Sequence, residues 1–437
     1  MVFKDATYNN ASKNYPSQHL KTTYMNIPFS PPFIDQSVID QVLDTLQNKW
    51  ITSGPKVKAL ELEILKLTHS KSAICVNSWT SGAIMMLKWF GVKEGDEVIV
   101  PAYTYCATAL SILHCGATPV MVDILDDLTI DPLKIKQAIN SKTKAIMAVD
   151  IAGLPCHYEA INSIIKDPDI NQLFNPQTDK QDLLGRILLI SDAAHSIGAT
   201  YRNLPAALKS DITIFSFHAV KNITTAEGGC ICLNLPEVFD NTEEYNFLKM
   251  FSLNGQTKDA FAKSMGANWR YDIIFKGLKI NMPDICAAIG LAQIKLYNDH
   301  LLPLRKKIAI KYCQKLKMFS WFIHPILKDK TRESSYHLFP LRIKNITEAD
   351  RDQIIEFLMS RGINVNVHFI PMPMLSYFKS IGYKIEDYPN SYKQYACEIS
   401  LPIYPQLTDE EVNYIVDNVV EGVNIKTKSS KLLEVVS

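Results

Sequence analysis

The chain has 437 residues, which is more than one simple hydrophobic core usually organises, so we expect two domains. Hydrophobic residues make up 47% of it and charged residues 21%, a balance that is ordinary for a soluble globular protein. The formal net charge of +1 gives no electrostatic reason to expect nucleic acid or a membrane as a partner.

Segments that would direct the chain out of the cytoplasm are not evident. Residues 1–10 contain no apolar stretch as long as that of a signal peptide, and no apolar run reaches about 18 residues. We therefore expect a cytoplasmic protein. The nine cysteines include no C-x-x-C pair, so they are interpreted as reduced thiols in the core, and no metal site is predicted.

The first part of the chain shows alternating helices and strands. Residues 1–26 are polar and lack a period, which indicates an N-terminal arm, and helices are predicted over 35–49 and 56–69. Strands that are apolar on both faces then alternate with helices. The predicted strands cover 73–76, 97–100, 118–122, 145–149, 187–190, 212–217 and 230–233, and the helices cover 80–90, 108–114, 132–139 and 158–165. This pattern is typical of a mostly parallel sheet covered on both sides.

The alternation is interrupted between residues 166 and 186 by a polar, turn-rich stretch, DPDINQLFNPQTDKQDLLG. A surface insertion is the simpler interpretation, and a partner-binding loop is the alternative.

The last third of the chain has a second α/β pattern. A long helix is predicted over 291–318, followed by strand-like residues 337–344, a helix over 348–361, strand-like residues 364–370 and a helix over 409–420. We therefore expect a large domain over 27–297, a small C-terminal α/β domain over 298–424, and a frayed tail over 425–437.

An acid and a lysine follow two of the predicted strands. Asp192 ends one apolar run, and Lys221 comes shortly after another. Parallel sheets bind ligands at the carboxyl ends of their strands, so both side chains would reach one crevice. Such a pair could serve pyridoxal phosphate (PLP), the lysine forming a Schiff base and the acid pairing with the pyridinium nitrogen. A solvated ion pair between loops is the alternative.

The sequence around this pair closely resembles the DegT/StrS-type nucleotide-sugar aminotransferases, a PLP family of fold type I. The resemblance rests on DAAHSIGA (192–199) and FSFHAVKNITTAEGG (215–229), and it recurs in order along residues 27–422. The further matching strings are WITSGP (50–55), PAYTYCAT (101–108), GLKINMPDICAAIGLAQIKL (277–296) and SLPIYP (400–405).

The resemblance implies roles around the cofactor ring. Lys221 matches the Schiff-base lysine, and Asp192 matches the acid that keeps the pyridine nitrogen protonated. His195 matches the position beside the ring hydroxyl, although a histidine before a helix could equally be a cap or core group. Tyr105 matches an aromatic residue that lies against the pyridine face, and a core tyrosine at a strand end is the alternative.

Other matching positions surround the cofactor phosphate and the substrate. Thr80, Ser81 and Ser216 match phosphate contacts, and the first two would also serve as an ordinary helix cap. Asn281 matches an asparagine that reaches the phosphate from the neighbouring subunit, which implies a homodimer with shared active sites. The substrate contacts expected are His368 and Thr52.

The activity that the resemblance implies is amino transfer to a keto group of a nucleotide-linked sugar. The segments PFSPP, WITSGP and 216–229 look most like enzymes that make UDP-4-amino-4-deoxy sugars of the L-arabinose type, for lipid A modification or surface polysaccharide, with L-glutamate as donor. Amination at C3 remains an alternative to C4. Two other functions are kept open: a PLP-dependent sugar dehydratase, in which histidine would replace Lys221, and a non-catalytic regulator on the same fold.

Overall fold

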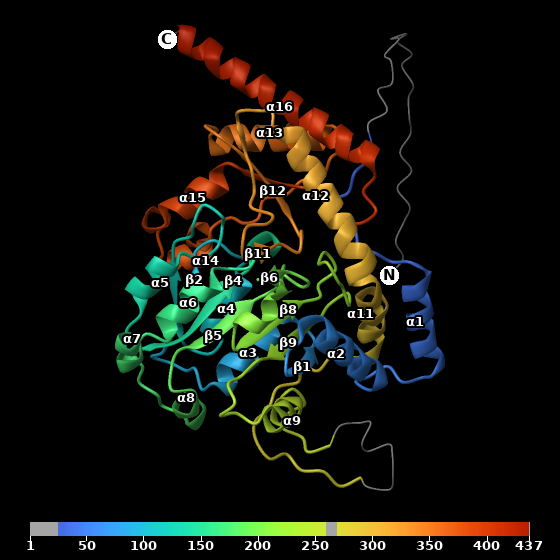
Figure 1. The fold of residues 1–437 in the computed structure, drawn as a ribbon, viewed down its shortest axis with the longest axis vertical. Helices are drawn as coiled ribbons and strands as arrows, with labels where there is room; N and C mark the ends of the chain where they lie inside the picture. Colours follow the sequence, from blue (N-terminus) through green and yellow to red (C-terminus); the bar gives the residue numbers. More distant parts are fainter. Residues whose placement is uncertain (1–24, 259–268, 437) are drawn as a thin grey trace, which may run out of the picture.

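A computed structural model describes residues 25–258 and 269–436, with side chains described through residue 426. A large domain is built around a seven-stranded sheet and a smaller one around a three-stranded sheet (Figure 1). Residues 1–24 of the predicted N-terminal arm lie outside the described residues.

The large sheet has the strand order β1-β9-β8-β5-β4-β2-β3. Its strands are β1 (Ser72–Val76), β2 (Glu97–Pro101), β3 (Thr118–Val122), β4 (Thr143–Val149), β5 (Leu188–Asp192), β8 (Ile212–Ser216) and β9 (Gly229–Leu233). Within this sheet β9 is antiparallel to both neighbours, and the other pairs are parallel. The predicted mainly parallel sheet is therefore confirmed, and the carboxyl ends of β5 and β8 lie side by side.

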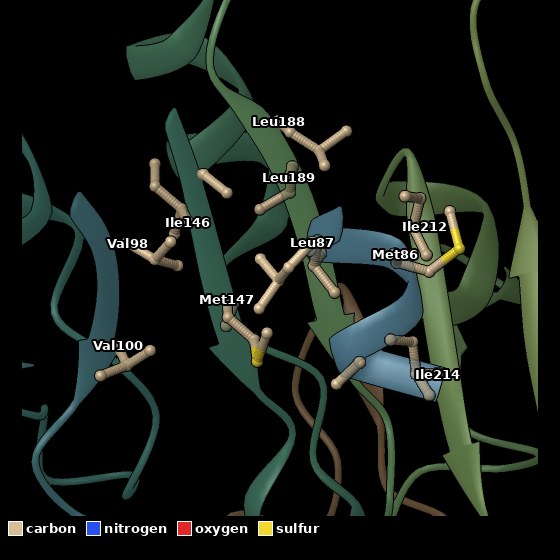
Figure 2. Packing of buried hydrophobic residues seen from close by; sticks show 14 of the residues in the cluster. Met86, Leu87, Val98, Val100, Ile146, Met147, Leu188, Leu189, Ile212 and Ile214 are labelled. Atoms are coloured by element: carbon tan, nitrogen blue, oxygen red, sulfur yellow. The ribbon is translucent and has the colours of Figure 1, made fainter. Parts of the chain in front are cut away.

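Helices cover both faces of this sheet. Ala73 and Cys75 of β1 join a core with α2 (Pro55–Thr68) and α11 (Asp284–Leu296), whereas the alternate residues of β1 join a core with α3 (Trp79–Trp89). Figure 2 shows Met86 and Leu87 of α3 among apolar side chains of β4, β5 and β8. Other helices of this domain include α1 (Gln36–Gln47), α4 (Ala107–Leu113), α5 (Pro132–Ala138), α6 (Tyr158–Ile165) and α9 (Asn241–Phe251).

The small domain has its own core. Its sheet, of order β10-β12-β13, consists of β10 (Phe322–Ile323), β12 (Phe339–Ile343) and β13 (Glu398–Leu401), and the packed helices are α12 (Leu302–Leu316), α13 (Glu348–Ser360) and α16 (Asp409–Val436). Ile27 is buried in this second core, and its N–H donates to Gly362 O. None of the described helices combines the length and the apolar character needed to cross a membrane.

Polar contacts join the two domains. The strand β11 (Arg332–Glu333) pairs with β6 (Thr200–Tyr201), which pairs with β7 (Leu204–Pro205). Asp123, after β3, accepts hydrogen bonds from the backbone N–H groups of Asn390 and Ser391 at the start of α15 (Pro389–Ala396). Arg332, which is 2% exposed as a side chain, pairs with Asp127 at 2.9 Å. The short helix α14 (Ser376–Ser380) lies between β11 and α15 in sequence.

Three predicted elements differ in the structure. Residues 364–370 form no strand; only an isolated bridge joins Asn366 to Ser400, because the segment instead contacts the large domain, where the Tyr103 hydroxyl donates to His368 O at 2.6 Å. The long helix begins at Asp284 and contains a π-helical turn at Tyr297–Leu301 before α12. The last helix continues to Val436, so the residues predicted as a frayed tail extend α16.

The interrupted segment 166–186 is also more ordered than its composition suggested. It contains α7 (Pro168–Leu173) and α8 (Asp179–Leu184), whose N-caps are Asp167 and Thr178. Ile170 and Phe174 join the large core, and the buried Lys144 donates to Asn175 O. The predicted surface insertion therefore contains two short helices and packs on the domain.

Candidate functional site

A cavity of about 410 Å³ lies at the carboxyl ends of β5 and β8. It is lined by Asp192 and Lys221 from the large domain and by His337 and His368 from the small-domain part of the chain. The two residues that sequence reasoning paired are thus brought to one crevice by parallel neighbouring strands.

Lys221 lies on the loop that follows β8. This loop is closed by hydrogen bonds from Phe217 N–H to Gly228 O and from Thr225 N–H to Phe217 O, each 2.9 Å. Burial lowers the pKa of Lys221 to about 8, although the nearby Asp192 acts in the opposite direction. About a tenth of the amine is therefore unprotonated and nucleophilic at pH 7.

Asp192 ends β5 and is 4% exposed. Thr108 Oγ1 donates to its Oδ2 at 2.8 Å, and Ala194 N–H donates to its Oδ1 at 3.2 Å. Burial raises the pKa of Asp192 to about 7, against the effect of these hydrogen bonds and of Lys221. A cationic ring nitrogen placed beside this carboxyl would favour its ionised form.

Two buried histidines lie next to this pair. The ring centroids of His195 and His337 are 4.4 Å apart, and burial followed by the charge of Lys221 holds the pKa of His195 well below its usual range. His195 Nδ1 has no hydrogen-bond partner among the described residues. His337 Nδ1 lies 2.9 Å from Asn222 Oδ1, while the Asn222 amide donates to Ser335 O, so His337 carries its proton on Nδ1.

The N-terminus of α3 forms another wall of the cavity. Thr80 and Ser216, the predicted phosphate contacts, line it together with the N-cap residue Ser78. Gly229 of β9 allows the first residue of α3 to lie close to the strand, because a Cβ there would lie 2.8 Å from Trp79 N. Ser81 does not line the cavity; its N–H donates to Ser78 Oγ, which is the capping contact that was its alternative interpretation. Unpaired N–H groups at such a helix end suit a phosphate.

Aromatic and substrate-contact candidates divide into two groups. Tyr105 lines the cavity with 60% of its surface exposed, its ring centroid 5.9 Å from that of Phe369, and His368 also lines the cavity. Thr52 is exposed and Asn281 bonds to Ser53 Oγ at 2.6 Å; neither lines the cavity of its own chain.

Sequence reasoning missed several residues of the site. Thr108 ends the string PAYTYCAT, and only the fold shows that its hydroxyl meets Asp192. His337 and Glu227 also line the cavity. The only sequence signal for His337 was its place at the start of a predicted strand. It shares the cavity with Lys221 because the two domains are in contact. The described parts of the chain contain no group of three or more His, Cys, Asp or Glu side chains that could bind a metal ion.

The residues present fit PLP. The carboxyl of Asp192 suits the ring nitrogen, the unpartnered His195 Nδ1 suits a ring oxygen, and the end of α3 suits the phosphate. When bound to an amine substrate, PLP supplies an electron-accepting ring that stabilises charge at the adjacent carbon. Lys221 supplies the amine that can hold its aldehyde.

Comparison with known proteins finds relatives that are sugar aminotransferases or take part in polysaccharide biosynthesis. The chain is 40% identical to the PMP form of the putative sugar aminotransferase Spr1654 from Streptococcus pneumoniae, with a TM-score of 0.88 and coverage of 93% of this chain and 100% of that one. It is 28% identical to Helicobacter pylori PseC, an aminotransferase involved in pseudoaminic acid biosynthesis, with a TM-score of 0.78 and coverage of 91% and 99%. It is 34% identical to the spore coat polysaccharide biosynthesis protein SpsC of Bacillus subtilis, covering 91% of this chain and 96% of that protein.

The sequence model of the DegT/DnrJ/EryC1/StrS aminotransferase family matches residues 32–174 and 181–420. The unmatched residues 175–180 cover most of the connection between α7 and α8 and the first two residues of α8. This match, the similar structures and the geometry of the cavity agree. The chain belongs to the DegT/DnrJ/EryC1/StrS family and is a PLP-dependent aminotransferase of fold type I.

Proposed function

We propose that this enzyme transfers an amino group from L-glutamate to the C4 keto group of a UDP-linked sugar, for surface polysaccharide or lipid A modification. The observation that carries the proposal is one cavity holding a buried lysine of lowered pKa beside a buried carboxyl, with walls from both domains. The names of SpsC and PseC support a role in sugar biosynthesis. The UDP group and the C4 position rest on the resemblance of PFSPP, WITSGP and residues 216–229.

The residues divide the work by position. Lys221 would hold the cofactor aldehyde and could move a proton at the reacting carbon, because its amine is desolvated and partly unprotonated. Asp192 would pair with the ring nitrogen, and Thr108 orients that carboxyl. His195, whose Nδ1 has no partner among the described residues, would hold the ring oxygen, and Tyr105 would hold the ring face.

The sugar would occupy the remaining space. His368 and Phe29 line this part of the cavity, with ring centroids 5.4 Å apart and an angle of 20° between the rings. A sugar needs such polar groups and ring faces to fix its orientation. We therefore assign His368 to substrate binding.

A homodimer with shared sites forms part of the proposal. Asn281 and Thr52 lie outside the cavity of their own chain, where they could reach a second copy. Ile39, Leu43 and Leu46 of α1 and the following Ile51 are about half exposed, and apolar surface of this kind favours an interface.

Purified enzyme incubated with L-glutamate and a panel of nucleotide-linked keto sugars tests the function. We expect the UDP-4-keto sugar to give an amino sugar and 2-oxoglutarate in equal amounts by mass spectrometry. Borohydride should attach the cofactor to the peptide that contains Lys221, and Lys221→Ala should abolish turnover. Loss of water from the sugar without gain of nitrogen would instead establish the dehydratase alternative.

A further inference from the structure

His368 differs from His195 and His337, the two buried histidines of the cavity, in what its ring contacts. His368 Nδ1 lies 2.8 Å from Ser400 Oγ, so its Nε2 is left for the cavity that the ring lines. A hydroxyl can donate or accept, unlike the Asn222 amide oxygen that fixes His337. The proton on the His368 ring is therefore determined by what Ser400 itself contacts.

Ser400 contacts the carboxyl of Glu398, which does not line the cavity. Ser400 Oγ lies 2.5 Å from Glu398 Oε1, and the other oxygen, Oε2, accepts the backbone N–H of His368 at 3.0 Å. Glu398 and Ser400 have no exposed surface, and both point from β13 to the same side because they are two residues apart in a strand. The result is a continuous hydrogen-bonded chain from Glu398 through Ser400 to His368.

The hydroxyl has one proton, so the chain has two states. When Glu398 is ionised it can only accept; Ser400 donates to it, and His368 must carry its proton on Nδ1, which leaves Nε2 as an acceptor. When Glu398 is protonated on Oε1 it donates to Ser400. Ser400 then donates to Nδ1, and Nε2–H becomes a donor toward the cavity.

The geometry points to Glu398 and Ser400 as positioning residues that decide whether His368 offers the substrate a hydrogen-bond donor or an acceptor. This inference rests on the proposed role of His368 in substrate binding. The donor state suits an oxygen that only accepts, such as a phosphate or keto oxygen of the nucleotide sugar. The acceptor state suits a sugar hydroxyl, so the buried carboxyl selects which oxygen of the substrate His368 binds.

The charges around Glu398 come from several elements. Arg342 of β12 is its cross-strand neighbour, and Arg351 of α13 donates to its backbone oxygen at 3.0 Å rather than to its carboxyl. Tyr103 and Cys397 also face it. Burial nevertheless raises the pKa of Glu398 to about 8, because neither arginine side chain makes a hydrogen bond to the carboxyl oxygens among the described contacts.

The ring itself stays neutral across this range. Burial, followed by the charge of Lys221, lowers the pKa of His368 to about 3. A change near pH 8 would therefore move one proton between the two ring nitrogens rather than add a second. Below that pH the donor state is expected to prevail.

The substitution Glu398→Gln separates the two states. The backbone N–H of His368 requires an acceptor, so the amide oxygen would replace Oε2 and the NH₂ group would face Ser400. The NH₂ group can only donate, which locks His368 with Nε2–H at every pH. Glu348→Gln is the matched control, since Glu348 lies 4.0 Å from the same Arg351 but is not in the chain to His368.

Nitrogen-15 NMR of the holoenzyme labelled in histidine rings measures the tautomer directly, with His368→Gln identifying the signal. Between about pH 6 and about pH 10, the protonated nitrogen of His368 should change from Nε2 to Nδ1 in the wild type and in Glu348→Gln, but not in Glu398→Gln. Ser400→Ala should also remove the change, which keeps the test valid if the first variant folds poorly. An unchanged tautomer in the wild type, or the same transition in Glu398→Gln, would overturn the inference.

The NMR measurement is made without any sugar, so its result does not depend on whether the substrate is UDP-linked. A kinetic arm tests the consequence for binding. At about pH 9 the KM for the nucleotide sugar should be up to about tenfold higher in the wild type than in Glu398→Gln, because about a tenth of the wild type stays in the donor state one pH unit above the Glu398 pKa of about 8. Equal KM values would show that the tautomer does not select the substrate oxygen.

Discussion

At the scale of single residues, burial adjusts the acid and the base of the site in opposite directions. The pKa of Asp192 is raised to about 7 and that of Lys221 is lowered to about 8, each mainly by burial. Both neutral forms are therefore accessible near neutral pH, where proton transfer between an enzyme and its substrate is most effective. The cost is an unfavourable carboxylate in the cofactor-free protein, which a cationic ring nitrogen would relieve.

This cost predicts a pH dependence of stability. The folded PLP-free chain keeps the Asp192 proton up to about pH 7, whereas the unfolded chain loses it near the ordinary value of 3.8, so the free energy of unfolding falls as pH rises between these values. Asp192→Asn lacks this contribution. The difference between wild type and variant in urea unfolding should thus shift against the wild type from about pH 4 to about pH 7 and then level off. A pH-independent difference would contradict the raised pKa.

At the scale of elements, the segment carrying α7 and α8 supports the helix whose other end forms the site. Thr178 Oγ1 and Gln181 Nε2 both donate to Phe90 O, at 3.2 Å and 2.9 Å, just beyond the end of α3. Lys180 pairs with Glu244 of α9. The segment therefore closes the end of α3 that lies away from the cavity.

Removing one of these contacts should reduce stability without changing catalysis. Gln181→Ala leaves its buried partner with one donor fewer, and we expect a loss of about 1–2 kcal/mol in the free energy of unfolding. Turnover should stay near that of the wild type. Gln172→Ala, at an exposed position of α7, serves as the control and should change neither quantity. Equal stability of the two variants would show that the segment does not support α3.

At the scale of the whole molecule, the domains are tied by several contacts that do not involve the cavity. Asp123 binds the start of α15, and Arg332 bridges Asp127 and Asp329 at 2.9 and 2.7 Å. The wall contributed by His337 and His368 is held against the large domain by such contacts.

The proposed dimer predicts complementation between inactive variants. If Asn281 reaches the partner's cofactor phosphate, Asn281→Ala should weaken PLP affinity without unfolding the chain, as measured by absorbance titration and circular dichroism. A mixed dimer of Asn281→Ala and Lys221→Ala contains one wholly wild-type site, so exchange of subunits should restore activity. No recovery between two inactive variants that demonstrably exchange would exclude shared sites.

The sequence by itself determined the mainly parallel sheet and the place of Asp192 and Lys221 in it. Apolar runs and turn residues are local signals, and the carboxyl ends of parallel strands meet whatever the loops do. The motif strings likewise determined the family. Local signals failed at residues 364–370, whose strand-like pattern yields only one bridge, and at 166–186, whose polar composition concealed two packed helices.

Only the tertiary structure decided which distant side chains touch. Thr108 meets Asp192 across 84 residues, and Ser400 meets His368 across 32, because packing of strands and of two domains brings them together. The pKa values of Asp192 and Glu398 were equally hidden, since they depend on burial rather than on sequence neighbours. Contacts and burial are properties of the packed chain, so chemistry that depends on them appears only after folding.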